Sequence, residues 1–442
     1  MNGRSTTLTT RRFGRKGRDS CLASPARSET NLGRFAAPIE LKTEELPGWP
    51  TLQSPALNTR ALGSLIFARI VYAINWLNLG AIFYLVSPDI GAGVSGLGTV
   101  SSTFFLGVGL MQVPGGLLAA KWGSKRVVVA GIFLSSISAL GTSVLSTIPQ
   151  MAVLRFFVGV GMALVFAPGV VILARLIGGT GKSGIGVGLF NSAFDLGGVA
   201  AFIGWIVIAA ATGWRLSLAL SGGLGIITGV LVALFVPGDN AKSEFNITRA
   251  GTLSILLDKQ LVILGLATLG LGVGNAVITG FMVYYLHNSL SISGTVAGLT
   301  GNLVTFVPIF TAVWGGRFYD RITKHRMVMI ISLLGSAACL IIGAFPSLLA
   351  AVVCSALGGA VSGIGYTFAF AGARDIHKAE KEYDSLAIAW INSIQLTGSF
   401  LPPIFFSYLV EAQGYSQAWL GSAGLTLIFV IPVLLMAERW TH

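Results

Sequence analysis

The sequence predicts an all-α membrane protein in which twelve transmembrane helices form two pseudo-symmetric six-helix bundles around a central cleft. Three observations support this fold class: an apolar composition, a series of long apolar segments, and a repeat with a period of 200 residues. Hydrophobic residues make up 53% of the 442 residues and charged residues only 10%, whereas soluble domains carry about 25% charged residues. Most of this chain is therefore expected to lie in a lipid bilayer.

Twelve apolar segments are long enough to cross a bilayer, which takes about 20 residues at a rise of about 1.5 Å per residue. The first six are expected at 62–86, 96–120, 127–147, 150–176, 184–211 and 216–237, and the second six at 260–286, 294–316, 327–345, 348–373, 385–410 and 417–437. Residues 238–258 are the longest internal connection. We therefore expect one six-helix bundle over 59–237, a cytosolic linker over 238–258 and a second bundle over 259–442.

Residues 1–58 precede the first apolar segment and are rich in arginine. Their composition weakly resembles a transit peptide, and it is more typical of a disordered basic cytosolic tail close to anionic lipid. Beyond this tail, lysine and arginine are concentrated in one set of loops, and the other set holds only Arg215. Because positively charged loops stay in the cytosol, this bias predicts a multi-pass protein of the cell membrane with both termini cytoplasmic.

The charge and cysteine patterns exclude several classes of function. The net charge of +12 does not indicate nucleic-acid binding, because the basic residues lie in loops and the tail rather than on one folded face. Cys21, Cys339 and Cys354 are scattered, and no cysteine or histidine cluster has metal-site spacing. Residues 178–183 lack the first glycine of a phosphate loop. We expect no metal, no cofactor and no enzymatic activity, and a monomer whose partners are the bilayer, a small-molecule substrate and protons.

Each half contains the same short basic turn between two apolar segments. The first copy, over 116–126, reads GLLAAKWGSKR, and the second, over 316–326, reads GRFYDRITKHR. Counting by 200 also aligns Gly159 with Gly359. Bundles built from repeats bind solute near the bilayer midplane and expose it to each side in turn.

These turns resemble a motif of the major facilitator superfamily, G-x-x-x-D-R-x-G-R-[KR]-[KR], and the resemblance covers residues 60–437. It implies gating roles for residues in both turns, namely Gly116, Gly123, Lys125, Arg126, Gly316, Asp320, Arg321 and Arg326. Ala120 replaces the aspartate in the first copy. Arg155-x-x-x-Gly159-x-Gly161 matches a fourth-helix motif of the family, and this implies a role for Arg155 in proton coupling. The stretch over 72–78 loosely resembles the first helix of the anion:cation symporter branch.

Three charged side chains lie inside the predicted spans, Arg69, Arg155 and Asp195, and each costs about 2.5–3.5 kcal/mol or more at a bilayer centre. Asp195 is the candidate proton-coupling carboxylate with Arg155 as its partner, and the alternative is a structural ion pair. A guanidinium such as that of Arg69 suits a carboxylate or a phosphate, which motivates a small organic anion as substrate. The alternative for both arginines is extension to the membrane surface.

Polar side chains at mid-span complete the candidate substrate site. The expected substrate-binding residues are Arg69, Tyr72, Asn75, Asn78, Asn275, Asn302, Asn392 and Gln395. For each amide the alternative is a hydrogen bond between two helices, worth about 0.6 kcal/mol.

The sequence as a whole predicts a secondary active transporter that works by alternating access. We expect it to be proton-coupled and to carry a small organic anion. An exporter of hydrophobic compounds and a transporter-like receptor that binds solute without moving it are the alternatives.

Overall fold

A computed structural model describes residues 58–177, 183–238, 249–319, 321–376 and 384–436, and these residues form helices and turns with no β-strand among them. The basic tail, part of the predicted linker and Asp320 lie outside the described residues. The first half contains α1 (Thr59–Ile90), α2 (Val94–Trp122), α3 (Ser124–Thr142), α4 (Ile148–Ile177), α5 (Ser183–Val199), the π-helix η2 (Ala200–Gly204), α6 (Trp205–Thr212) and α7 (Trp214–Phe235).

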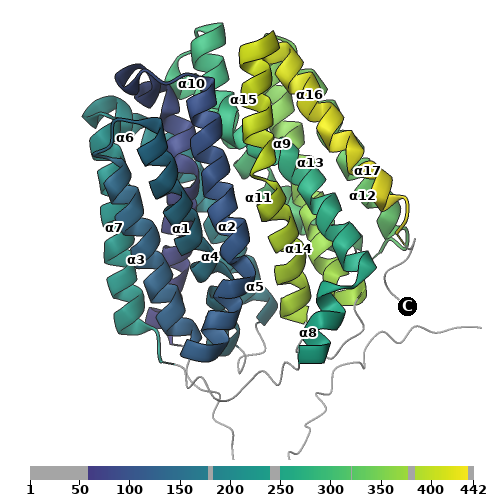
Figure 1. The fold of residues 1–442 in the computed structure, drawn as a ribbon. Coiled ribbons are helices and arrows are strands. Elements are labelled where there is room, and N and C mark those ends of the chain that lie inside the picture. The colour runs from purple at the N-terminus through teal and green to yellow at the C-terminus, as the bar shows by residue number, and fades with distance from the viewer. Residues whose placement is uncertain (1–57, 178–182, 239–248, 320, 377–383, 437–442) are drawn as a thin grey trace, which may run out of the picture. The chain divides into compact units, whose positions relative to one another are not determined.

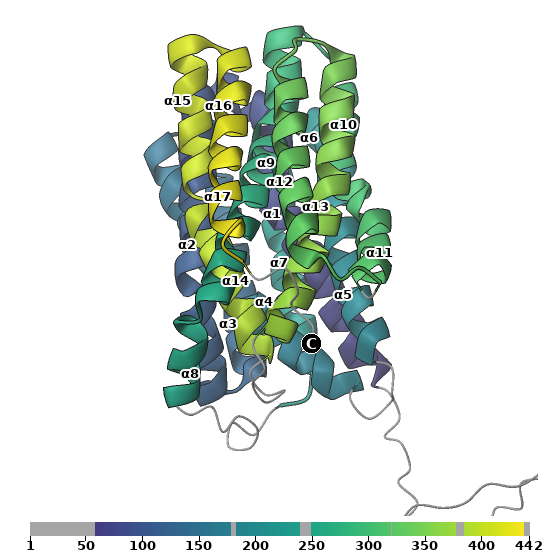
Figure 2. The same cartoon turned by 90° about the vertical axis from the view of Figure 1, so that its right-hand side faces the viewer.

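The second half contains α8 (Arg249–Leu256), α9 (Lys259–Leu290), α10 (Gly294–Phe306), α11 (Pro308–Tyr319), α12 (His325–Gly343), α13 (Leu348–Ile376), α14 (Asp384–Gly398), α15 (Leu401–Gln413), α16 (Tyr415–Ile428) and α17 (Val430–Val433). Figure 1 shows the helices of the first half mainly on the left and those of the second half mainly on the right. The view in Figure 2 shows the long helices of the second half running roughly side by side.

In the described part of the chain, 11 helices are long and apolar enough to cross a membrane. The segment predicted over 385–410 accounts for the difference from twelve, because it is divided into α14 and α15 at Ser399 and Phe400. Pro402 and Pro403 lie in the first turn of α15 and have no N–H group to continue the hydrogen bonds of α14. Each part is therefore too short to span by itself, while the two in succession match the predicted segment.

Helix α8 was not predicted, since residues 238–258 were expected to form only a linker. Its Ile255 is fully buried, in a hydrophobic cluster with residues of α9 and α13. One apolar side chain packed on the second half thus holds this short helix.

The 200-residue repeat is visible in the helix bounds. Helix α1 covers Thr59–Ile90, and α9 covers Lys259–Leu290. Both end in a residue of left-handed conformation, Gly91 with φ 61° and Ser291 with φ 55°. Ser291 is the only non-glycine residue with positive φ among the described residues, so the repeat preserves the backbone turn even where the sequence has lost the glycine that favours it.

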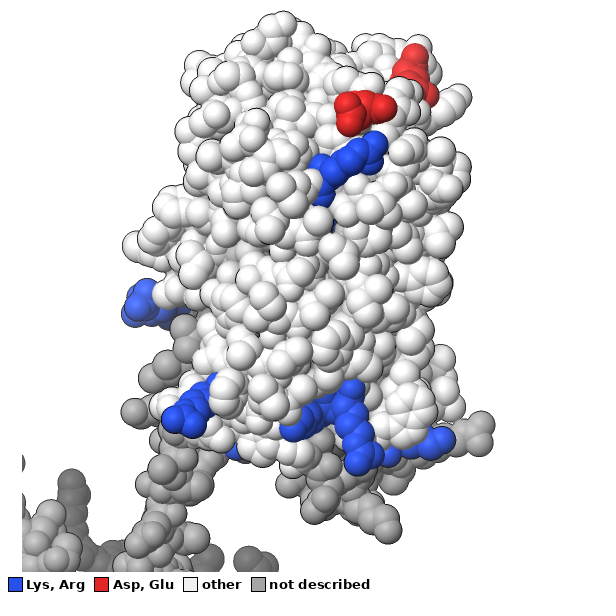
Figure 3. All heavy atoms as spheres, turned by 90° about the vertical axis from the view of Figure 1, so that its left-hand side faces the viewer, with Lys and Arg blue, Asp and Glu red and all other residues white. Residues whose placement is uncertain are grey.

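Charge distinguishes the two ends of the helices. We call the end at which α2 and α4 finish the basic end, because Lys121, Lys125, Arg126 and Arg175 lie there. The end at which α1 finishes at Ile90 and α2 begins at Val94 is the far end. Figure 3 shows basic side chains mainly toward one end of the molecule, acidic ones near the other, and a largely uncharged surface between. This is the distribution expected of a membrane protein with cytosolic basic loops.

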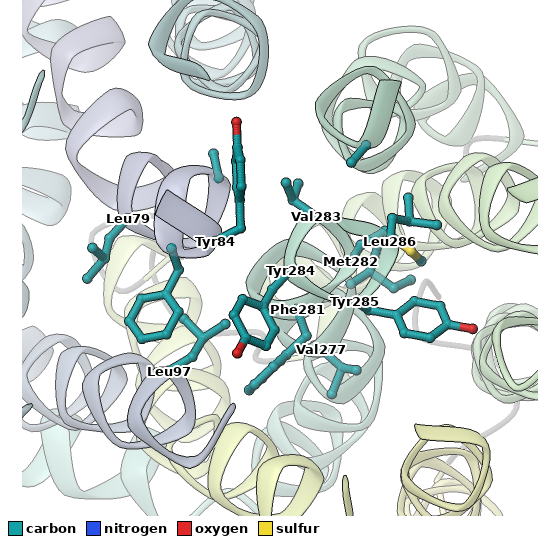
Figure 4. Close-up of a cluster of buried hydrophobic side chains, with 14 of the residues drawn as sticks. Leu79, Tyr84, Leu97, Val277, Phe281, Met282, Val283, Tyr284, Tyr285 and Leu286 are labelled. Atoms are coloured by element: carbon teal, nitrogen blue, oxygen red, sulfur yellow. The ribbon is translucent and has the colours of Figure 1, made fainter. Parts of the chain in front are cut away.

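The two halves share one hydrophobic core at the far end only. Residues 77–86 of α1 and 277–286 of α9 pack there in a single cluster with α2, α15 and α16. Figure 4 shows Tyr84 and Leu97 of the first half beside Phe281 and Tyr284 of the second. Toward the basic end, the first half has its own cluster, which takes only Leu396 from the second half, and the cluster of the second half contains no residue of the first.

Polar contacts reinforce the junction at the far end. The hydroxyl groups of Ser87 and Tyr284 lie 3.3 Å apart. The backbone N–H of Ser95 donates to Glu411 Oε1 at 3.3 Å, so a carboxylate of the second half caps the N-terminus of α2, which has no side-chain cap of its own.

Glycines line the seam between the halves. A methyl group added at Gly98 of α2 would lie 2.7 Å from Ser407 Cβ and 2.9 Å from the Pro403 carbonyl oxygen of α15. One added at Gly298 of α10 would lie 2.6 Å from the Phe202 carbonyl oxygen of η2. Small residues thus allow backbone-to-backbone contact between helices of different halves, as is common in membranes.

Candidate functional site

Arg69 lies in a cage of aromatic rings. Its guanidinium carbon is 4.5 Å from the ring centre of Tyr72, 4.7 Å from that of Phe194, and 4.9 Å from those of Phe166 and Phe190. The side chain is 7% exposed, and its Nε and Nη1 atoms have no hydrogen-bond partner. Ring faces attract a cation but leave its N–H groups unsatisfied, so the cage holds a buried positive charge that can still donate hydrogen bonds.

Three helices position this cage. Tyr72 follows Arg69 by about one turn on α1, Phe166 comes from α4, and Phe190 and Phe194 are one turn apart on α5. Helix α5 approaches α1 closely at Gly197, where an added methyl group would lie 2.7 Å from Ala73 Cβ. The rings of Phe166, Phe190 and Phe194 were not predicted as site residues, although the i, i+4 spacing on α5 could have indicated a shared face.

The aromatic cluster extends beyond the cage through Trp76. Its ring centre lies 5.7 Å from that of Tyr72, 4.8 Å from that of Phe104 and 6.0 Å from that of Phe194. Leu396 of α14 belongs to the same hydrophobic cluster. The second half therefore contributes an apolar side chain next to the cage.

Asp195 is half-buried and follows Phe194 directly. Its carboxyl group interacts electrostatically with Arg69. In the described residues no salt bridge within 4 Å joins it to an arginine. The pairing predicted between Asp195 and Arg155 is not present in this structure, and the cation nearest in effect to Asp195 is Arg69.

Arg155 contacts the backbone of α1 instead. Its Nη1 donates to the carbonyl oxygen of Asn75 at 3.0 Å and its Nη2 to that of Trp76 at 3.2 Å. The guanidinium carbon lies 4.8 Å from the ring centre of Phe104. Arg155 is 5% exposed and does not extend to the membrane surface. It is a fixed link between α4 and the middle of α1.

Two predicted substrate-binding amides face a neighbouring helix. Asn75 Nδ2 donates to the carbonyl oxygens of Val71 at 3.2 Å and Ser221 at 3.3 Å. Asn78 Nδ2 donates to Ser221 Oγ at 2.9 Å. Ser221 belongs to α7, so these side chains tie α1 to α7, and the structural alternative describes them better than substrate binding.

The predicted polar residues of the second half lie apart from one another. Gln395 Nε2 donates to the hydroxyl of Tyr366 at 3.1 Å, and the Tyr366 ring stacks on Phe370 at 6.2 Å. Asn392 is buried and Asn275 is half-buried. The Gln395–Tyr366 pair is the clearest polar contact that the second half offers, and Tyr366 was not predicted.

Asn302 lies at the seam. Its side-chain oxygen accepts from Thr305 Oγ1 at 3.1 Å, and the residue borders a groove of about 460 Å³ lined by α5, η2, α10 and α13. Apolar side chains make up most of this lining, including Val199, Ile203 and Phe306. A groove of this kind suits contact with lipid better than polar recognition.

The predicted gating residues occupy turns at the basic end. Gly123 has φ 92° and joins α2 to α3, Gly116 and Gly316 border open space, and Lys125, Arg126 and Arg321 are exposed or partly so. Arg326 donates to the carbonyl oxygens of Leu434 at 3.4 Å and Met436 at 3.2 Å. The gating role of these residues stays a prediction.

A family model described as Major Facilitator Superfamily matches residues 65–273 and 264–439. The chain belongs to this superfamily. It is a multi-pass membrane transporter, and the two-domain transporter fold expected from the repeat is confirmed.

Three relatives illustrate what superfamily members carry. An uncharacterized MFS-type transporter of Methanocaldococcus jannaschii is 23% identical over 82% of this chain and 94% of its own length. The probable galactarate/D-glucarate transporter GudP of Escherichia coli is 32% identical over 40% of this chain and 41% of its own length. The 4-hydroxybenzoate transporter PcaK of Pseudomonas putida is 23% identical over 60% of this chain and 67% of its own length.

Among solved structures, a bacterial homolog of the human lysosomal transporter Spinster, in an inward-facing and occupied conformation, has a TM-score of 0.70. It is 15% identical, and the match covers 86% of this chain and 96% of that one. At this identity the similarity establishes the fold alone.

Proposed function

We propose that this superfamily member is a secondary active transporter of the cell membrane that carries a small organic anion together with a proton. The observation that supports the proposal is the buried guanidinium of Arg69, which has two nitrogen atoms without hydrogen-bond partners. Buried cations without such partners are costly. A carboxylate that entered the cage would supply both the missing charge and the missing acceptors.

Asp195 provides the coupling in this proposal. The Asp195 carboxylate and a substrate carboxylate would both be stabilised by the positive charge of Arg69, and each would repel the other. A proton on Asp195 removes this competition, so the proton and the anion bind best together. The consequence is symport, in which neither the unprotonated loaded form nor the protonated empty form is favoured.

The packing of the halves supports an alternating-access cycle. In this structure the far end is closed by a shared core, and the cores near the basic end are separate but for Leu396. If the basic end faces the cytosol, as the excess of lysine and arginine indicates, this is the state in which the site communicates with the cytosol. Opening requires the contacts of the far end to separate. Both termini are then cytoplasmic.

The test is solute-driven proton movement in proteoliposomes containing wild type, Arg69→Gln or Asp195→Asn, with a panel of carboxylates, phosphate esters and neutral compounds. We expect an anion to move protons into wild-type vesicles. Arg69→Gln should reduce anion transport by about tenfold or more, since it removes a charge-assisted hydrogen bond. Asp195→Asn should abolish proton movement while leaving anion exchange intact.

Three outcomes would overturn the proposal. Movement of neutral apolar compounds alone would favour an exporter of hydrophobic compounds. Anion transport that Arg69→Gln leaves unchanged would remove the recognition role. A ligand that raises the melting temperature without being moved would favour a receptor.

A further inference from the structure

We infer that the anion is a monocarboxylate with a flat, apolar body, of which benzoate is the simplest probe. This inference rests on the proposed function, since it takes Arg69 as the anion-binding cation. It goes further in naming the charge and the shape of the substrate, and it assigns the selectivity to Phe166, Phe190 and Phe194 together with Tyr72.

The charges of the buried residues allow one carboxylate. Arg69 and Arg155 are the buried arginines in the described part of the chain. Arg155 is already occupied, because its two terminal nitrogens donate to carbonyl oxygens of α1. Asp195 lies on the Arg69 side of the site and would repel a second negative charge. A dicarboxylate would therefore bring one charge that no buried cation neutralises.

The walls of the site are apolar where they meet Arg69. All four groups that surround the guanidinium within 4.9 Å are aromatic rings. The nearest amides on α1, Asn75 and Asn78, donate toward α7 and not toward the cage. A sugar acid with several hydroxyl groups would leave those groups without partners, which is unfavourable when they are buried.

A flat ring suits the arrangement of the rings that are present. Trp76 meets Phe104 at an interplanar angle of 81° and Phe194 at 86°, and edge-to-face contacts of this kind are the geometry that aromatic rings prefer. An aromatic carboxylate can place its charge on Arg69 and its ring among these faces. A branched or hydroxylated body of the same size makes fewer such contacts.

The experiment measures equilibrium binding of radiolabelled benzoate to the purified full-length chain in detergent. Unlabelled benzoate, D-glucarate and neutral benzyl alcohol serve as competitors. The variants are Phe194→Leu, Arg69→Gln and a matched control, Phe345→Leu, whose side chain is 62% exposed and remote from the cage. We expect Phe194→Leu to weaken benzoate binding by about two- to tenfold. Arg69→Gln should weaken it at least about tenfold, and Phe345→Leu should leave it unchanged.

The outcomes separate this inference from the proposed function. If labelled D-glucarate binds in an Arg69-dependent way and benzoate does not, the anion role of Arg69 stands and the inference about its substrate is wrong. If benzyl alcohol competes as well as benzoate, or if Arg69→Gln still binds benzoate, ring binding is independent of the charge and both proposals fail. Equal benzoate affinity in Phe194→Leu and Phe345→Leu would remove the selectivity role of the cage. Failure of both anions to bind would overturn the inference as well.

Discussion

A methyl group at Gly98 should open the far end. Gly98 lies on α2 against α15, and an added Cβ would be 2.7 Å from Ser407 Cβ and 2.9 Å from the Pro403 carbonyl oxygen. Distances this short are not tolerated between carbon and backbone atoms. Because one of the two obstacles is backbone, a change of side-chain rotamer does not relieve the contact, and Gly98→Ala requires α2 and α15 to move apart.

The expected size of the effect follows from the cost of overpacking. Inserting a group into a well-packed site costs about 1–3 kcal/mol. Only the state closed at the far end incurs this cost, since the two helices separate in the other state. The equilibrium should therefore shift by about 5- to 150-fold toward the state that is open at the far end.

The assay is labelling of a single cysteine by a maleimide in lipid nanodiscs, where both membrane faces are accessible. The reporter is Val94→Cys, a buried position at the far end, in a chain with its three natural cysteines replaced by alanine. Gly98→Ala should raise the labelling rate. The control is Gly223→Ala on α7, where an added methyl group would meet nothing within 4 Å. Equal rates in the two variants would refute the argument that backbone contact at Gly98 holds the far end closed.

Three further predictions use single positions. Ser291→Gly should raise the free energy of unfolding by about 1 kcal/mol, because a left-handed non-glycine residue costs about 1–2 kcal/mol, partly offset by the freedom of glycine in the unfolded chain, and Gly91→Ser at the equivalent turn should lower it; thermal unfolding in detergent measures both, and changes of the same sign would contradict the repeat argument. Asn78→Ala should lower stability by about 0.6 kcal/mol and leave the Kd for the transported anion unaltered, so a large loss of affinity would show that this amide does contact substrate. Glu411→Ala should weaken the cap of α2 by about 1 kcal/mol and raise labelling of the cysteine reporter, whereas Glu411→Gln, which keeps an acceptor oxygen, should raise it less; wild-type labelling in both would show that the cap does not hold the far end.

The sequence predicted the spans well because the length of an apolar run is fixed by the thickness of a bilayer. Helix α1 was predicted over 62–86 and covers Thr59–Ile90, and α4 was predicted over 150–176 and covers Ile148–Ile177. The break between α14 and α15 could have been anticipated from Pro402 and Pro403. Helix α8 is too short for a membrane signal, and it depends on the burial of one side chain, Ile255.

The direction in which each polar side chain of α1 points could not be predicted. The apolar window of this helix is 78% buried, so it packs against neighbours all round and has no single apolar face from which to fix its rotation. Asn75 and Asn78 were therefore expected in the substrate site and instead face α7. The same uncertainty explains why Asp195 was assigned to Arg155. Both residues are charged and near mid-span, and only the packing of α5 against α1 places Asp195 on the side of Arg69.

The glycine seam has a consequence for the rate of transport. Where helices meet through Gly98, Gly298 and their neighbours, the surfaces have little relief, so the halves can separate without side chains being withdrawn from interlocking holes. The activation barrier between the two access states should then depend mainly on the apolar area exposed. A smooth surface does not by itself define the register of the halves when they close again. The contacts of Ser87 with Tyr284 and of Ser95 with Glu411 can supply that alignment at the end of each turnover.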